Sequence, residues 1–237
     1  MKVIKAMLES GGRHSSIKAL DACGGSGNAA LKVLELGMEA WLCDQSQNLI
    51  NIFEKKCSKK GYECHFILSE IGQYLATTND SYDLIVFSSA LHHLEDYESV
   101  LRLALKRLNN NGMIFSSFDP IKWRFPAKQI VKIEYIVFKL LNDFGDFFPA
   151  AYRRIRKVFS SRQEKENRAV KEDNLGELAE FHVDQGIDDD RLVVQLKLHG
   201  AEIIWHKKLC KSRYRFFEIL LSVLGCKTNF KLLLKRI

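Results

Sequence analysis

Between residues 17 and 117, short apolar runs alternate with segments whose apolar side chains recur at helical spacing. The runs have the length and the branched or aromatic composition of buried strands, and they lie at 17–22, 39–43, 63–68, 82–87 and 113–117. The helical segments between them are expected at 28–36, 47–59, 71–76 and 97–108. Strands that alternate with helices of about ten residues form parallel β-α-β units with both faces covered. The sequence therefore predicts an α/β fold with a doubly wound, mostly parallel sheet.

The stretch from 121 to 178 interrupts this alternation, because it is helical in spacing, apart from a polar loop expected at 160–174, and rich in aromatic and basic side chains. After Gly186 the alternation resumes, with helices expected at 187–198 and 213–224 and strands at 201–205 and 230–237. We therefore divide the chain into residues 1–120, a helical insertion at 121–178 after the fifth strand, and residues 179–237, which complete the domain of the first part.

The basic side chains are unevenly distributed. The whole chain has 36 Lys and Arg against 29 Asp and Glu, a formal net charge of +7. Residues 1–120 hold twelve basic and fourteen acidic side chains, whereas the last 31 residues hold nine and one. The excess in the insertion and the tail predicts an acidic acceptor or peripheral contact with an anionic membrane, unless it is only a solvated surface. Nucleic acid is the weaker expectation, because the sequence has no recognised nucleic-acid-binding module.

Six cysteines are present, and no two of them form a C-x-x-C pair. Zinc sites with short ligand spacing are therefore not expected, and we predict no metal. Unpaired cysteines within apolar runs are typical of a reducing compartment, which predicts a cytoplasmic location. The chain also has no run of eighteen apolar residues, so no membrane-spanning helix is expected.

A glycine turn, Gly25-x-Gly27-x-x-Ala30, connects the first strand to the first of these helices. Glycines there allow backbone N–H groups to approach a ligand, and the helix N-terminus favours an anionic group. Asp44 ends the second strand, where a carboxylate can accept hydrogen bonds from both ribose hydroxyls of a nucleoside. The pattern predicts an adenosine-containing cofactor. The alternative is an ordinary tight turn, with Asp44 capping the next helix.

Residues 20–27, with the sequence LDACGGSG, resemble motif I of the class I S-adenosylmethionine-dependent methyltransferases. The resemblance implies that Asp21 helps to hold the amino group of the cofactor and that Gly25 and Gly27 are the positions of closest approach. It also implies that Cys23 replaces the first glycine of the motif. Asp44 matches the ribose-binding acid, and Gln45 follows it as in the usual Asp-x-Ser of the family.

Further matches continue the resemblance along the chain. Glu70 falls where an acid commonly meets the adenine amino group, and we expect its neighbour Ile71 and the later Ser89 to line the same cofactor site. Residues 82–96 are similar to the fourth-strand motif, whereas 108–113 match the Leu-x-Pro-Gly-Gly motif only loosely. The resemblance covers about residues 15–120 and, by element order, 186–237. It implies S-adenosylmethionine as the cofactor and a Rossmann-like sheet of seven strands, the last antiparallel.

Two other functions remain open. Nicotinamide-dependent oxidoreductases share the glycine turn and the ribose acid, but they normally lack an acid at the position of Asp21 and the Leu-His-His-Leu segment at 91–94. A non-catalytic binding module with the methyltransferase fold is the third reading. Its support is Cys23 and the degraded turn at 109–112.

Methyl transfer to a hydroxyl oxygen, the reaction expected here, is helped by a general base, and imidazole suits that role near neutral pH. His92 and His93 follow the fourth strand at the carboxyl edge of the sheet, and His93 is the preferred candidate for the base. The alternative is that both histidines pack against or cap the helix that begins near Tyr97. Asp96 is most simply read as the cap of that helix.

The insertion at 121–178 is expected to act as a lid over the carboxyl edge. Its aromatic side chains and a cluster of cations would frame the acceptor, which we expect to be a flat or lipid-like small molecule that bears an acidic group. The cations are Arg153, Arg154, Arg156 and Lys157. The same composition would suit an anionic membrane surface. Only about sixteen residues precede the first strand, where the family often has extra helices, so the lid takes their place or the native start lies upstream.

Overall fold

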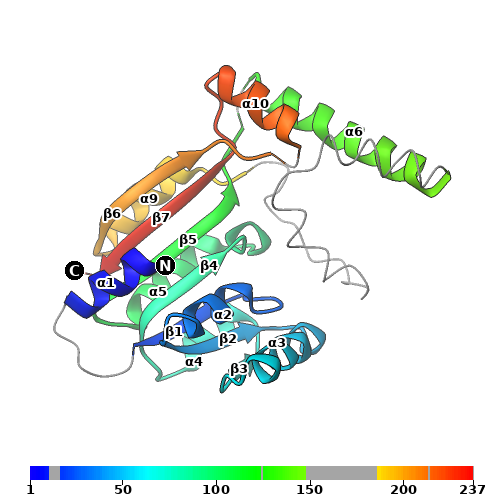
Figure 1. Ribbon diagram of the computed structural model, residues 1–237. Helices are drawn as coiled ribbons and strands as arrows, with labels where there is room; N and C mark the ends of the chain where they lie inside the picture. Colours follow the sequence, from blue (N-terminus) through cyan, green and yellow to red (C-terminus); the bar gives the residue numbers. More distant parts are fainter. Residues whose placement is uncertain (11–16, 124, 148–185, 213, 237) are drawn as a thin grey trace.

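Seven strands form one sheet at the centre of the protein (Figure 1). The computed structural model describes residues 1–10, 17–123, 125–147, 186–212 and 214–236. The strands are β1 (Lys18–Ala22), β2 (Glu39–Asp44), β3 (His65–Leu68), β4 (Tyr82–Ser88), β5 (Leu108–Pro120), β6 (Ala201–Leu209) and β7 (Asn229–Arg236). The helices are α1 (Lys2–Ser10), α2 (Asn28–Leu34), α3 (Gln47–Lys60), α4 (Ile71–Thr77), the 3₁₀ turn η1 (Leu91–His93), α5 (Tyr97–Lys106), α6 (Ala127–Phe147), α9 (Asp189–Leu198) and α10 (Arg215–Val223).

The strand order is β3-β2-β1-β4-β5-β7-β6. Neighbouring strands from β3 to β5 pair in parallel, whereas β7 runs antiparallel to both β5 and β6. The predicted seven-stranded, doubly wound sheet with an antiparallel last strand is thereby confirmed. Because the chain order reverses between β1 and β4, the connections leave these strands in opposite directions. The two diverging connections leave a crevice at the carboxyl ends of the strands, where ligands of such sheets bind.

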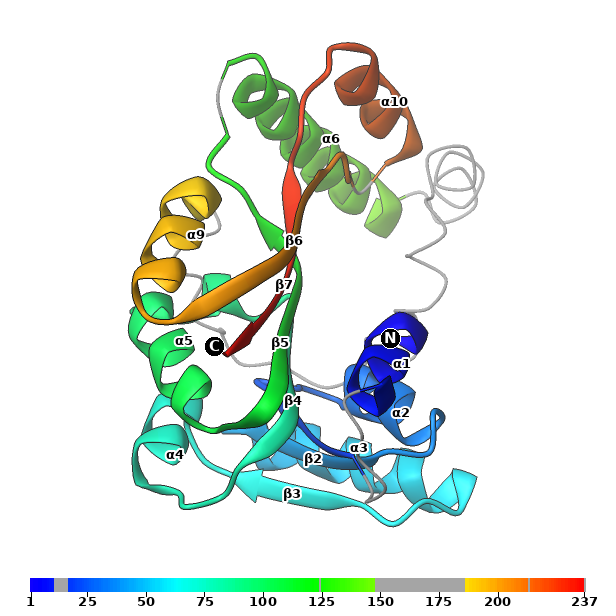
Figure 2. The ribbon, with the colours of Figure 1, turned by 90° about the vertical axis from the view of Figure 1, so that its left-hand side faces the viewer.

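Helices cover both faces of the sheet, as the edge-on view shows (Figure 2). One apolar cluster joins the sheet to α4, α5 and α9, and it includes the buried Leu75, Leu101 and Leu196. The other joins it to α1, α2 and α3, with Phe53 completely buried. Strands enclosed in this way bury side chains on both faces, which explains the continuous burial of β4 from Tyr82 to Phe87.

The helix α1 is an element that the sequence analysis did not identify. Ile4 and Leu8 are one helical turn apart, and both are buried in the cluster beneath α2 and α3. This spacing of four is the signal that could have revealed the helix. Lys5 and Glu9, also four apart, form a partly exposed ion pair on another side of α1.

Two local predictions have different outcomes. Asp96 does cap α5, since its carboxylate accepts a hydrogen bond from the backbone N–H of Ser99 at 2.9 Å. The turn expected at 109–112 is instead the first part of β5, where the pairing with β4 is irregular and Asn111 has a left-handed backbone, with φ of 62°. The strand therefore absorbs the asparagines as an irregularity rather than beginning after them.

The described part of the insertion consists of 121–123 and 125–147. Helix α6 follows β5 and packs against α10 at one end of the molecule, beyond the tips of β6 and β7 in both views (Figures 1 and 2). The predicted cationic cluster at 153–157 lies outside the described residues. Across the part of the chain that is described, no helix combines the length and the apolar character needed to cross a membrane.

Candidate cofactor and acceptor site

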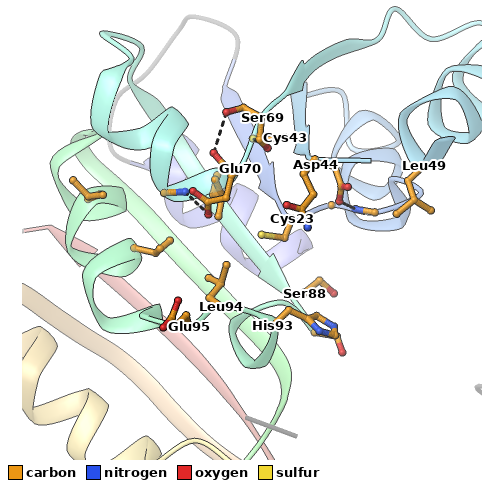
Figure 3. A pocket seen from close by; sticks show the side chains of 18 of the residues that line it. Cys23, Cys43, Asp44, Leu49, Ser69, Glu70, Ser88, His93, Leu94 and Glu95 are labelled. Atoms are coloured by element: carbon orange, nitrogen blue, oxygen red, sulfur yellow. Dashed lines mark hydrogen bonds between the residues drawn. The ribbon is translucent and has the colours of Figure 1, made fainter. Parts of the chain in front are cut away.

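A cavity of about 760 Å³ lies at the carboxyl ends of β1, β2 and β4, bounded by α4, η1 and the start of α5 (Figure 3). It is lined by eight of the eleven residues that the sequence predicted for the site: Cys23, Gly25, Asp44, Gln45, Glu70, Ile71, Ser89 and His93. Asp21, Gly27 and His92 are not among the lining residues, although the ring of His92 lies against that of His93. The sheet therefore brings most of the predicted residues to one space, from positions up to 70 residues apart.

Asp44 connects the end of β2 to the glycine turn. One carboxylate oxygen accepts a hydrogen bond from the backbone N–H of Gly25 at 2.8 Å, and the other accepts one from the N–H of Ser46 at 2.9 Å. The cap of α3 is Ser46, not Asp44, because the hydroxyl of Ser46 accepts from the N–H of Leu49. Each Asp44 oxygen keeps further acceptor capacity toward the cavity. This carboxylate therefore fixes the turn and remains able to accept ribose hydroxyls.

Gly25 and Gly27 both have left-handed backbones, but for different reasons. A Cβ on Gly25 would meet no atom within 4 Å, so this residue faces open space in the wall of the cavity. A Cβ on Gly27 would lie 2.1 Å from the ring of Phe53, because α2 and α3 pack closely there. Gly25 leaves room for a ligand, whereas Gly27 allows the two helices to approach each other.

Cys23, which replaces the first glycine of the motif, also has a left-handed backbone, with φ of 53°. For a residue with a Cβ this conformation costs about 1–2 kcal/mol relative to the right-handed one. The side chain lines the cavity, as Figure 3 shows. Burial raises the pKa of the Cys23 thiol well above its usual range, so the thiol is neutral at physiological pH. Cys23 thus keeps the shape of the turn and adds a neutral sulfur to the cavity wall.

Asp21 is buried directly behind this turn. One carboxylate oxygen accepts the backbone N–H of Ala30 at 2.8 Å, and the other has no hydrogen-bond partner among the described residues. Burial, and to a lesser extent the charge of Asp44, raises the pKa of Asp21 to about 7, although the Ala30 bond opposes this shift. A buried carboxylate with an unsatisfied oxygen is stabilised by a cation, and the ammonium of a bound amino acid is one.

Glu70 caps helix α4 with both carboxylate oxygens. These oxygens accept the backbone N–H groups of Gly72 at 2.8 Å and Gln73 at 2.7 Å. The side chain lies at the rim of the cavity (Figure 3). Each Glu70 carboxylate oxygen can accept a second hydrogen bond, and the predicted contact with an adenine amino group would use one of these.

His92 and His93 occupy the 3₁₀ turn η1 and differ in their surroundings. His93 lines the cavity, and its ring lies 4.0 Å, centroid to centroid, from the ring of His92. His92 is buried, and its Nδ1 lies 3.0 Å from a carboxylate oxygen of Asp119, a residue with no exposed surface. The hydroxyl of Ser116 donates to the other oxygen of Asp119 at 2.9 Å. An ionised carboxylate only accepts hydrogen bonds, so Nδ1 of His92 carries the proton.

The sequence analysis missed several residues that line the cavity. Most are apolar or small side chains from α3, α4, α5 and the segment before α5, among them Leu49, Gly72, Leu94, Val100 and Leu103. The helical spacing of Val100 and Leu103 marks them as apolar positions of a helix but cannot tell a cavity wall from the core. Asp119 was also missed, because nothing in its local sequence indicates that it lies beside His92.

These observations fit a nucleoside cofactor that carries an amino acid. The volume of the cavity is typical of ligand sites, the wall at Gly25 is open, and Asp44 has acceptors facing the space. The unsatisfied oxygen of Asp21 would gain a partner from the ammonium group. S-adenosylmethionine, the cofactor implied by the sequence resemblance, has a ribose and an ammonium group of this kind.

Comparison with known proteins also indicates a methyltransferase. Residues 19–112 match a family model described as "Methyltransferase domain". The curated relative tRNA 5-carboxymethoxyuridine methyltransferase of Escherichia coli (strain K12) is 30% identical over 134 residues, which cover 48% of this chain and 50% of the relative. Demethylmenaquinone methyltransferase of Bacillus velezensis (strain DSM 23117 / BGSC 10A6 / LMG 26770 / FZB42) is 24% identical over 152 residues, 62% of this chain and 64% of the relative. The match thus spans half of the length of the first relative and just under two thirds of the second.

Solved structures show the same fold over nearly the whole chain. An S-adenosylmethionine-dependent methyltransferase from Clostridium acetobutylicum ATCC 824 superposes with a TM-score of 0.58 and 12% identity, over 99% of this chain and 89% of that one. At this identity the likeness concerns the fold. Together with the family match and the arrangement of Gly25 and Asp44, it leads to one conclusion: residues 19–112 match a methyltransferase domain, and the chain has the fold of the class I S-adenosylmethionine-dependent methyltransferases.

Proposed function

We propose that this protein transfers a methyl group from S-adenosylmethionine to a hydroxyl oxygen of a small, lipid-like acceptor, with His93 as the general base. The observation that carries the proposal is a single cavity with Gly25 and Asp44 on one side and His93 on another. A cofactor site alone would not need a titratable imidazole in its wall. An imidazole beside the site of a methyl donor can accept the proton of an attacking hydroxyl.

In this mechanism the protein binds, orients and excludes water. When bound, the cofactor supplies an electrophilic methyl group on a sulfonium. Asp44 would accept the ribose hydroxyls of the nucleoside end beside the open backbone of Gly25, and Asp21 would hold the ammonium. His93 removes the hydroxyl proton of the acceptor as the oxygen attacks. Asp119 acts at a distance, because it fixes the His92 ring against which the ring of His93 lies.

A lipid-like acceptor is supported by one of the relatives, which is named for demethylmenaquinone. The apolar cavity walls at Leu94, Val100 and Leu103 are compatible with an acceptor of that kind. We further propose that the acceptor bears an acidic group and that the protein works on the cytoplasmic face of a membrane. The cations of the insertion and the tail favour an anionic partner, and all six cysteines are free thiols.

A second candidate acceptor is RNA. The other curated relative is named for a tRNA nucleoside, and its identity of 30% is the higher of the two. The net charge of +7 would also suit a phosphate backbone. We rank this candidate second because RNA binding needs a large basic surface, and the sequence has no recognised nucleic-acid-binding module.

The first experiment tests the cofactor site. Calorimetry with S-adenosylhomocysteine is expected to give micromolar or tighter binding to the wild type. Asp44→Asn, which keeps the size and one acceptor, should weaken binding at least tenfold, since a hydrogen bond from a hydroxyl to a charged group contributes about 1.5–3 kcal/mol. Asp188→Asn is the matched control: it changes the cap of α9, away from the cavity, and should leave affinity unchanged. Absence of binding by the wild type would disprove the proposal.

The second experiment identifies the acceptor. The protein is incubated with methyl-labelled S-adenosylmethionine and, separately, with a total lipid extract, an RNA fraction and a protein fraction. Label in the lipid fraction, with the methylated atom located by mass spectrometry, supports the first proposal. Label in RNA alone would replace it with the second candidate. Thermal stabilisation by nicotinamide cofactors but not by S-adenosylhomocysteine would favour an oxidoreductase instead.

A further inference from the structure

The outer face of α10 exposes a stripe of large apolar side chains. Phe216, Ile219 and Val223 follow the spacing i, i+3, i+7 and are between 55% and 79% exposed. Residues at this spacing lie on one side of a helix. The opposite side is occupied, because Phe217 and Leu221 pack against α6. Helix α10 is therefore apolar on both sides, and only one side is covered among the described residues.

Two more exposed apolar residues lie beside this helix. Leu224 follows α10 directly, and Phe125, in the turn before α6, is 81% exposed. Both line the same shallow cavity, together with Lys227, so these three residues are near neighbours. We call Phe125, Phe216, Ile219, Val223 and Leu224 the α10 outer face. Single apolar residues are common on protein surfaces, but three on one side of a helix, with two more beside its end, are a grouping that usually has a partner.

The sequence of α10 and its flanks is basic, although three aspartates at the start of α9 line the cavity beside Phe125 and Leu224. Two of these aspartates, Asp189 and Asp190, pair with Lys208. Between residues 210 and 227 the sequence has four basic residues and a single acid, Glu218. That acid already lies 3.6 Å from the ammonium of Lys211. Arg215 and Lys227 are exposed at the two ends of the helix. Apolar side chains flanked by cations are complementary to an anionic lipid surface, where the former enter the headgroup region and the latter meet phosphate groups.

The base of this helix is firmly held. The buried carboxylate of Glu134 on α6 accepts hydrogen bonds from the N–H of Tyr214 at 2.9 Å and from the hydroxyl of Ser212 at 2.5 Å. These contacts fix the chain just before α10, so the outer face is presented in one orientation. Figures 1 and 2 both place α10 at an end of the molecule, away from the helices that cover the sheet.

We infer that the α10 outer face docks the protein on an anionic membrane surface without crossing it. The inference is independent of methyl transfer, because docking requires neither cofactor nor acceptor. The part of the protein that makes the membrane contact is α10 with its flanking cations.

The test is co-sedimentation of the full chain with vesicles of phosphatidylcholine, with or without about one third phosphatidylserine. The wild type should bind the anionic vesicles and lose binding at high salt. Phe216→Ser/Ile219→Ser/Val223→Ser should lower the partition coefficient at least tenfold, because three exposed apolar side chains no longer enter the membrane. The matched control is Phe66→Ser/Leu68→Ser/Leu198→Ser, which removes one aromatic and two aliphatic exposed side chains elsewhere and should bind as the wild type does.

A second pair of variants tests the charge. Arg215→Ser/Lys227→Ser should weaken binding to anionic vesicles about thirtyfold, from about 1 kcal/mol for each cation near the surface. Lys55→Ser/Lys59→Ser removes two exposed cations from α3 and should have no effect. Unchanged melting temperatures and affinity for S-adenosylhomocysteine would show that every variant is folded. Failure of the wild type to bind anionic vesicles, or equal effects of the test and control variants, would overturn the inference. So would self-association abolished by the α10 substitutions, since the partner would then be a second copy.

Discussion

Asp119, at the carboxyl end of β5, holds the Nδ1 of His92 at 3.0 Å, although 27 residues separate them in the chain. Asp119 has no exposed surface, and its second oxygen is bound by the Ser116 hydroxyl. This pair fixes the tautomer and the ring orientation of His92. Its neighbour His93 faces the cavity and lies ring against ring with His92. The pair is thus placed to position the proposed base.

Replacing Asp119 by Asn should therefore impair catalysis more than binding. The amide keeps the size of the side chain but can orient His92 in the wrong tautomer. We expect kcat to fall about 10- to 100-fold, the range found when a carboxylate that orients a metal-binding histidine is removed, with the KM for S-adenosylmethionine within about twofold. The pH profile of kcat should also shift. Ser116→Ala is the milder companion variant. A loss of cofactor affinity equal to the loss of kcat would mean that the pair is only structural.

The ionisation of Asp21 should make the stability of the ligand-free protein fall as pH rises. The pKa of Asp21 is about 7 in the folded state against about 3.9 in an unfolded chain. The folded state then binds more protons at this group between these values, so the contribution of Asp21 to the free energy of unfolding is fully present below pH 4 and is lost as the pH rises through 7. Between pH 5 and 8 the free energy of unfolding of the wild type should fall by about 3 kcal/mol more than that of Asp21→Asn. Urea unfolding at both pH values measures the difference, and parallel pH dependences would contradict the prediction.

The same carboxylate should release a proton when the cofactor binds. A bound ammonium stabilises the charged form of Asp21, so its pKa falls. Calorimetry of S-adenosylhomocysteine binding near pH 6.5, in buffers of different ionisation enthalpy, should detect release of a fraction of one proton. This release should be absent in Asp21→Asn, which should also bind more weakly. Equal release by both proteins would mean that Asp21 does not meet the ammonium.

Cys23 offers a test of backbone strain. Cys23→Gly should stabilise the protein by about 0.5–1 kcal/mol, since glycine adopts a φ of 53° without strain but loses more entropy on folding. Cys23→Ala removes the thiol and keeps the strain, so it serves as the control and should not be stabilised. Thermal or urea unfolding of the three proteins gives the comparison. Equal stability of the Gly and Ala variants would exclude strain at this turn.

Gly25 and Gly27 should respond differently to alanine. Gly25→Ala should cost about 1 kcal/mol of stability, from the left-handed backbone alone, but should strongly weaken binding of S-adenosylhomocysteine, because its methyl group enters the cavity. Gly27→Ala should cost about 3 kcal/mol or more, because the added carbon collides with Phe53. The double variant Gly27→Ala/Phe53→Leu should recover part of that stability. Similar losses of stability for the two glycine variants would contradict this division of roles.

The sequence alone determined the alternation of strands and helices, because burial on both faces of a parallel sheet imposes apolar runs at regular intervals. It also placed Gly25 and Asp44 in one site, since residues at the carboxyl ends of neighbouring parallel strands must meet at one edge. Local chemistry sufficed for the cap of α5 at Asp96. These features depend on spacing and on nearest neighbours.

Only the tertiary structure decided which side chains pair across the fold. The contact of Asp119 with His92, the burial of Asp21 behind the cavity and the collision that keeps residue 27 a glycine all join positions distant in sequence. Apolar periodicity likewise marked α10 as a helix but could not tell its covered side from its exposed one. Such facts follow from how the elements pack, because packing brings together residues whose separation in the chain carries no information about their contact.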